Sequence, residues 1–225
     1  MDQRFLAETL SRRPQLFRAM LEFNRSVTPP ASPMGSAQVL NKAEDRLWAR
    51  PAFRKAYSMT PQSGWWDFSE ETCRLALLPP GDLYRACMFF SAAVYAEEMA
   101  KAIDKATVLA LREKLGREVY EYALRRGRYQ IGSLRDVLIA DAALPLADRI
   151  LGLAQSILEE LRLNWPPGLQ ALFDARTDSE ASATASGHGH APLPQFTPQQ
   201  RRAFWFTLKK ILIREAVPQW APCFD

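Results

Sequence analysis

The sequence predicts an all-α protein, organised as a single irregular helical domain with a flexible linker before its last helix. Glycine is scarce, with 10 residues in 225, whereas proline is common, with 16, and hydrophobic residues make up 48% of the chain. Scarce glycine together with many Ala, Leu, Glu and Arg favours helices over a turn-rich β architecture. Apolar residues recur at helical spacing in most segments. One segment near the C-terminus almost lacks large apolar residues and predicts the linker.

The N-terminal region predicts a broken helix that restarts at Pro14, since proline suits the first turn of a helix. Three prolines between positions 29 and 33 end this helix, because they cannot continue it. Its apolar stripe consists of Leu16, Phe17, Met20, Leu21 and Phe23.

Short helices are expected from Ala37 to Trp48 and from Pro51 onward. The following stretch, 60–69, has the composition of a turn. It nevertheless contains three large aromatic residues: Trp65, Trp66 and Phe68. Such rings in an irregular segment usually lock a loop onto the core, whereas the same rings exposed on a ridge would mark a docking site.

The centre of the chain predicts a pair of helices. Asp82 is the expected N-cap of the first, which runs to about Ile103 and is rich in apolar residues. The second is expected to run from near Lys105 to about Arg126, with Gly127 as its C-terminal signal.

The second central helix has a basic side. Between Lys105 and Arg135 the sequence contains eight basic and three acidic residues, an excess of five that exceeds the net charge of +4 of the whole chain. A solvated face with pairs such as Glu121–Arg125 is one interpretation, and an interface for an acidic partner is the other. The apolar side consists of Val108, Leu115, Val119, Tyr122 and Ala123. The candidate partner-binding residues on the other side are Lys114, Arg117, Arg125 and Arg128.

The domain organisation follows from the remaining segments. A helix from Pro145 to about Leu163, with apolar residues at alternating spacings of three and four, completes a helical body over residues 1–178. Residues 179–195 form the predicted flexible linker of Ala, Ser, Gly and His. In residues 196–225 a capping box of Thr197 and Gln200 begins the last helix, and an apolar tail is expected to pack back on the body.

Catalytic chemistry is not indicated by the residue pattern. Both histidines, His188 and His190, lie in the predicted linker, where a general base cannot be held near its target. The three cysteines are widely spaced and are expected to be buried free thiols. No glycine-rich phosphate loop occurs. We therefore expect a protein that is not an enzyme and that has no catalytic residues, metal site or cofactor.

The location of the chain is expected to be cytoplasmic. No apolar run approaches the roughly 20 residues that a spanning helix needs, and the first residues lack the apolar core of a signal peptide. The net charge of +4 and the pI of about 9.1 are compatible with an acidic protein partner, RNA or an anionic membrane surface.

Three blocks of the sequence resemble the SctK (YscK-like) family of type III secretion proteins. The block Leu75–Leu83 resembles the family's leucine-and-proline lead-in to two central helices. The block Leu115–Ala123 is similar to the second of those helices, and Lys210–Pro218 with the aromatic close at Phe224 resembles the family's C-terminus. The resemblance extends over about residues 15–225.

The resemblance implies a structural adaptor of the injectisome's cytoplasmic sorting platform, which is needed for protein secretion and virulence. It implies partners that are a SctQ-like pod protein and the cytoplasmic domain of a SctD-like inner-membrane ring protein, with no cofactor, no nucleic acid and no membrane insertion. The implied location is peripheral to the inner membrane, at the base of the apparatus. The alternatives are a nucleic-acid-binding regulator that uses the basic face around Arg117–Arg128, and a secretion chaperone. Against the regulator, no recognition-helix turn is evident and the basic residues are not interleaved with aromatic ones.

Overall fold

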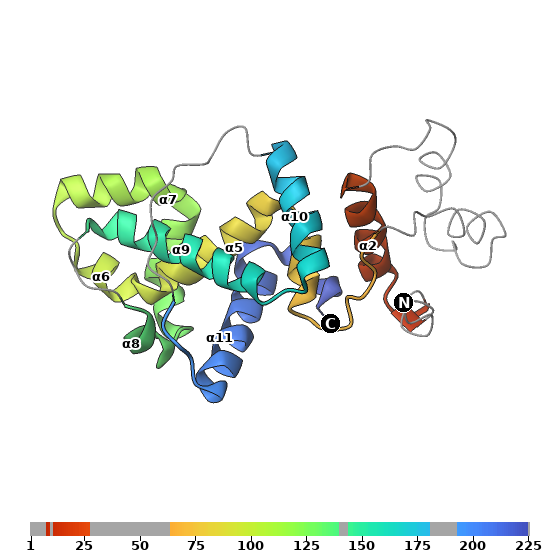
Figure 1. Ribbon diagram of the computed structural model, residues 1–225. Helices are drawn as coiled ribbons and strands as arrows, with labels where there is room; N and C mark the ends of the chain where they lie inside the picture. The colour runs from red at the N-terminus through yellow and green to blue at the C-terminus, as the bar shows by residue number, and fades with distance from the viewer. Residues whose placement is uncertain (1–7, 10, 28–63, 140–143, 181–192, 225) are drawn as a thin grey trace. The chain divides into compact units, whose positions relative to one another are not determined.

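The computed structural model in Figure 1 describes residues 8–9, 11–27, 64–139, 144–180 and 193–224. Within these ranges every regular element is a helix and no strand occurs, which confirms the predicted all-α class (Figure 1). The described helices gather into two compact units, where the sequence predicted a single body. Unit 1 consists of the described residues up to Leu77 together with residues 167–180, and unit 2 consists of the remainder.

Unit 1 is built from α2 (Pro14–Val27), the 3₁₀ helix η2 (Cys73–Leu77) and α10 (Pro167–Glu180), which pack on one another. Pro14 begins α2, as predicted. The predicted apolar stripe of α2 is buried, since each of its five residues is at most 8% exposed. Burial of this stripe on a neighbouring helix, more than intrinsic propensity, stabilises a helix of this length.

The loop that precedes η2 is fastened to α2. Phe68 is fully buried and stacks edge-on against Phe23, with ring centroids 5.8 Å apart. The Asn24 side chain donates to the Trp65 carbonyl and accepts from the Trp65 amide, at 2.7 Å in each case. Trp66 is also buried. These contacts confirm that the aromatic residues lock the loop onto the core.

Unit 2 is organised around α5 (Pro80–Val94), which contacts α7 (Lys105–Arg125), α9 (Leu146–Leu163) and α11 (Pro198–Ile211). Ten of the fifteen residues of α5 are buried, and this accounts for its apolar sequence. The smaller elements of unit 2 are α6 (Ala96–Lys101), η3 (Gly127–Tyr129), α8 (Leu134–Leu138), the π-helix η4 (Leu212–Ala216) and the 3₁₀ helix η5 (Pro218–Cys223).

Two details of the first central helix were predicted wrongly. The N-cap is Pro79, not Asp82, because Pro80 occupies the first helical position and the helix therefore begins three residues earlier than predicted. Asp82 lies in the first turn, and its carboxylate accepts a hydrogen bond from the Trp220 indole at 3.0 Å. The helix also ends at Val94 instead of Ile103, since the backbone breaks at Tyr95 and restarts as α6.

The later helices follow the predicted boundaries closely. The α9 helix spans Leu146–Leu163, and Ile150, Leu153, Ile157 and Leu161 are buried along it. The Thr197–Gln200 capping box begins α11, with Pro198 at the first helical position. The apolar tail is tied down in unit 2, where Cys223 and Phe224 are buried against the helices. All three cysteines are buried free thiols, as expected.

Several predicted segments fall outside the described residues. They include the short helices from Ala37 and from Pro51, and most of the predicted linker, whose first two residues belong to α10. Flexibility of residues 179–195 therefore stays a prediction. Limited proteolysis tests it, with first cleavage expected inside this span and protection of the span as the contrary outcome.

Candidate partner-binding surface

The α7 helix carries most of the predicted binding residues, and a kink divides it. Asp104 caps its start by accepting a hydrogen bond from the Thr107 amide at 2.8 Å. Gly116 interrupts the helix with φ 79° and ψ 158°, a conformation open to glycine because it has no Cβ atom. Lys114 and Arg117 consequently lie on different helical segments, so a single helical wheel does not place them.

Lys114 forms an ion pair within unit 2. Its ammonium group donates to the carboxylate of Asp148 in the first turn of α9. The pair is partly exposed, with side-chain exposures of 43% and 38%. The charge of Lys114 is thus compensated by a residue that is distant in the sequence and adjacent in the fold.

Arg117 is also compensated, by a residue on its own helix. Its guanidinium lies 2.6 Å from the Glu121 carboxylate, one turn later. The hydrogen bond from Arg117 lowers the pKa of Glu121, and the positive charges of Arg117, Arg125 and Arg112 lower it further. The same hydrogen bond raises the pKa of Arg117. Three guanidinium groups therefore lie near one carboxylate, and we call Arg112, Arg117 and Arg125 the arginine cluster.

Two members of the arginine cluster have guanidinium groups outside any ion pair in the described part of the chain. Arg125 and Arg112 are exposed and make no ion pair with any residue that the structure describes. The guanidinium of Arg112 lies over the Tyr120 ring, 5.9 Å from its centroid. A cation over an aromatic face keeps its outer edge available to a carboxylate or a phosphate.

Arg128 lies beyond the end of α7, in η3. Its guanidinium covers the ring of Tyr129 at 4.4 Å from the centroid and donates to the hydroxyl of that residue. Tyr129 is 71% exposed, so the pair stands at the surface. The structure thus brings together Arg117 and Arg125 around Glu121, joins Lys114 to α9, and places Arg128 in a separate stacked pair.

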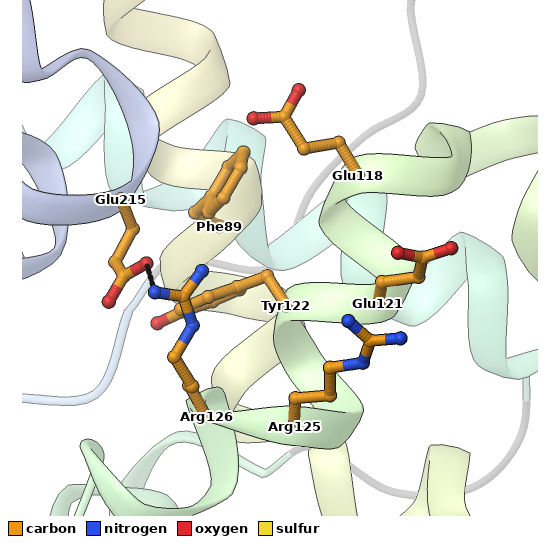
Figure 2. Close-up of a pocket in the computed structure, with 7 residues that line it drawn as sticks. All are labelled: Phe89, Glu118, Glu121, Tyr122, Arg125, Arg126 and Glu215. Carbon is orange, nitrogen blue, oxygen red and sulfur yellow. Dashed lines mark ion pairs between the residues drawn. The ribbon is translucent and has the colours of Figure 1, made fainter.

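A shallow pocket of about 130 Å³ adjoins the arginine cluster (Figure 2). The rings of Phe89 and Tyr122 form its apolar part, with centroids 4.8 Å apart. Figure 2 shows Arg125 extending beside Glu121, and Arg126 paired with Glu215. The charged residues that line the pocket are Glu118, Glu121, Arg125, Arg126 and Glu215.

A chain of polar contacts, which includes residues of the pocket lining, joins α7 and η4 through Gln130, the residue after η3. The Tyr122 hydroxyl donates to Gln130 at 3.0 Å, and the Gln130 amide donates to Glu215 at 3.1 Å. Arg126 lies 3.0 Å from the other oxygen of Glu215, whose side chain is only 7% exposed. Burial, reinforced by the charge of Glu215, raises the pKa of Tyr122 well above its usual range. This network holds the C-terminal segment on α7 and is a structural feature of the pocket wall.

Sequence reasoning missed the kink, the compensation of Lys114 and the exposed Arg112. An isolated glycine within a helical pattern is a known warning of a break, and Gly116 offered that signal. No local signal indicates Asp148, because it lies 34 residues from Lys114. The two Arg–Tyr pairs correct the expectation that the basic residues are not interleaved with aromatic ones.

Comparisons with family models, with curated proteins and with solved structures give no match to this chain. Among the described residues, no set of three or more His, Cys, Asp or Glu side chains is placed to hold a metal ion. The two histidines predicted to lie in the linker fall outside those residues. No helix in the described ranges combines the length and the apolar character needed to span a membrane.

Proposed function

We propose that this chain is a non-enzymatic adaptor of the cytoplasmic sorting platform of a type III secretion system. In this role it links a SctQ-like pod protein to the cytoplasmic domain of a SctD-like inner-membrane ring protein, at the cytoplasmic base of the apparatus. The resemblance of three sequence blocks supports the family. The arginine cluster of α7 supports a docking role, and it is the observation on which the proposal chiefly rests.

Each of the three blocks covers an end of a helix or a break within one. Leu75–Leu83 covers most of η2 and the beginning of α5, and Lys210–Pro218 covers the end of α11 and all of η4. Leu115–Ala123 includes the Gly116 kink and most of the second segment of α7. This block contains Arg117 of the arginine cluster and ends two residues before Arg125.

Spare positive charge suits an adaptor that must find and release its partners. Charge complementarity raises association rates and selects partners more than it adds raw affinity. Because Arg112 and Arg125 lack ion-pair partners in the described part of the chain, they can meet carboxylates of a partner without first breaking an internal pair. Lys114 and Arg117 would have to exchange Asp148 and Glu121 for the partner.

The test is charge reversal at the two uncompensated arginines. Binding of R112E/R125E to the purified SctQ-like protein and to the SctD-like cytoplasmic domain of the same bacterium is measured at low and moderate salt. We expect affinity for at least one of them to fall about tenfold or more, and the native interaction to weaken as salt rises. R117E is less suitable, because it places two carboxylates one turn apart on the helix.

The matched control is K101E/K105E, which makes the same change in net charge at exposed lysines outside the cluster. It should bind as the wild type does, and all variants should retain the wild-type circular dichroism. Unchanged binding of R112E/R125E to both proteins would return the arginine cluster to a solvated surface.

The Arg–Tyr pairs favour one alternative function, a nucleic-acid-binding regulator. The exposed ring of Tyr129 and the half-buried ring of Tyr120, each beside an arginine, could stack on bases while the arginines contact phosphates. The alternative predicts that a labelled single-stranded RNA binds the wild type, and that Y129A weakens it. RNA binding with this dependence, together with no binding to either platform protein, would replace the adaptor proposal.

A further inference from the structure

The α11 helix has two chemically different sides. Its inner side is buried against unit 2 and consists of Phe204, Thr207, Leu208 and Ile211. On the opposite side, positions 202, 206 and 210 follow one another at intervals of four residues and so share one face. We call Arg202, Phe206 and Lys210, with the partly exposed Ile213 that follows in η4, the outer face of α11.

Phe206 is the unusual residue of the outer face, because its ring is 69% exposed. A large aromatic side chain contributes little to folding in such a position, since most of its surface remains in water. Its flanking residues Arg202 and Lys210 supply positive charge on both sides along the helix. An aromatic ring surrounded by a charged rim is the usual arrangement of a protein interface centre.

The charge of this region is strongly one-sided. From Pro198 to Ala216 the chain has five basic residues and one acidic residue. That acidic residue, Glu215, is turned toward Arg126 and is almost fully buried. Arg201 lies 3.9 Å from Glu160, whereas Arg202 and Lys210 make no ion pair within the residues that the structure describes.

We propose that the outer face of α11 is a docking surface for an acidic amphipathic helix of a partner protein. The apolar side chains of that helix would cover Phe206 and Ile213, and its carboxylates would meet Arg202 and Lys210. Helix-on-helix docking of this kind uses apolar anchors at helical spacing, with flanking charges that select the partner. Phe206 is the expected hot spot, since aromatic residues at the centre of an interface carry most of the binding energy.

A membrane surface fits the outer face less well. A helix that lies in a bilayer interface buries a broad apolar side, but the broad apolar side of α11 already forms part of the core of unit 2. Nucleic-acid-binding helices present mainly polar side chains and arginines to base edges, instead of a central phenyl ring. An acidic amphipathic helix can cover the phenyl ring with apolar side chains and pair its carboxylates with the cations.

This inference is independent of the arginine cluster. The two surfaces share no residue, and Glu121 and Tyr120 of α7 do not belong to the outer face. Variants of Arg112 and Arg125 therefore test the proposed function without altering the outer face of α11. Variants of Phe206 test the outer face without altering the cluster.

The experiment measures binding of a fluorescent synthetic peptide to the full chain by anisotropy. The probe is an amphipathic helix of about five turns, with leucine on one side and glutamate on the other. We expect wild-type protein to bind it with an affinity that falls as salt rises, F206A to weaken binding about tenfold or more, and R202E/K210E to remove it. F206L should retain most of the affinity, because an apolar anchor remains.

Controls separate this face from charge in general. A peptide of the same composition with its leucines scattered around the helix should bind weakly, and K101E/K105E should bind the probe as the wild type does. Each of three results would overturn the proposal: no binding of the probe by wild-type protein, equal binding by F206A, or equal loss in K101E/K105E. Phe206-dependent binding to phosphatidylcholine–phosphatidylglycerol vesicles or to single-stranded RNA, with no binding of the peptide, would reassign the face to a membrane or to nucleic acid.

Discussion

The α7 and α11 helices are both rich in cations, but unit 2 compensates them to different degrees. In α7 and at its C-cap, three cations have short ion pairs: Lys114 pairs with Asp148 of α9, Arg117 with Glu121 of the same helix, and Arg126 with Glu215 of η4. Along α11, Arg201 makes a long ion pair with Glu160, at 3.9 Å. Arg202 and Lys210 stand beside an exposed phenyl ring.

The difference shows that charge counted along a sequence does not predict the charge that a surface presents. The stretch from Lys105 to Arg135 has the larger excess, five charges, yet half of its eight cations are in ion pairs. The spare charge of α7 is therefore confined to a few positions, Arg112 and Arg125 among them. Substitutions in the two helices can measure how firmly each is packed into unit 2 and how much of its outer surface is available.

The largest expected effect separates the two sides of α11. Leu208 is fully buried, so L208A removes packed apolar volume and should lower the free energy of unfolding by about 2–5 kcal/mol. F206A, on the same helix, should lower it by less than about 0.5 kcal/mol, because Phe206 is exposed. Urea denaturation followed by circular dichroism measures both. Similar losses in the two variants would show that the outer face is packed in solution.

The next effect concerns the attachment of η4 to α7. Glu215 is nearly buried and accepts from both Gln130 and Arg126, so E215A should lower the free energy of unfolding by about 1.5–3 kcal/mol. E215Q should cost less, because an amide oxygen can still accept from Gln130. A loss below about 0.5 kcal/mol in E215A would mean that the network contributes little to holding the C-terminal segment.

Alkaline pH provides a second test of the same network. The pKa of Tyr122 is raised above its ordinary value of 10.0 in the folded chain, chiefly by burial. A group of this kind contributes stability that is fully present below pH 10 and is lost as the pH rises further, by roughly 1 kcal/mol per unit. Y122F should be slightly less stable at pH 8 and should lose less stability above pH 10. An identical alkaline decline in both proteins would contradict the assignment.

The smallest effect is expected for the pair that fastens α7 to α9. Lys114 and Asp148 are both partly exposed, so a double-mutant cycle to alanine should give a coupling of about 0.2–1 kcal/mol that decreases at high salt. R125A, which removes an arginine without an ion pair, should change the free energy of unfolding by less than about 0.5 kcal/mol. A larger loss in R125A than in K114A would mean that the ion-paired and the unpaired cation are assigned the wrong way round.

Much of the fold was predictable because it depends on residues that are close together in the chain. The start of α11 needs only Thr197, Pro198 and Gln200, and the extent of α9 follows from its apolar spacing. The error at Asp82 has a local cause as well. Pro80 and Asp82 are both typical of helix starts, and the helix begins at Pro80, which leaves Asp82 in the first turn.

The candidate site was predicted less well. The wheel placed Lys114, Arg117, Arg125 and Arg128 on one continuous face, but the Gly116 kink and the end of α7 at Arg125 divide that face. The exposure of Phe206 was not predicted, because the sequence does not show which aromatic residue of the last helix lies outside the core. Exposure depends on packing partners, and those partners come from α5 and the C-terminal segment.

The sequence by itself determined the helical class, the starts of α2 and α11, the extent of α9 and the clustering of basic residues, because each depends on short-range geometry and composition. Only the tertiary structure decided which basic side chains are in internal ion pairs and which are available to a partner. Compensation requires an acidic group within a few ångströms, and for Lys114 that group lies 34 residues away in the sequence. The distance between two charged groups in space, unlike their separation along the chain, is set by how α5, α7 and α9 pack around a common core.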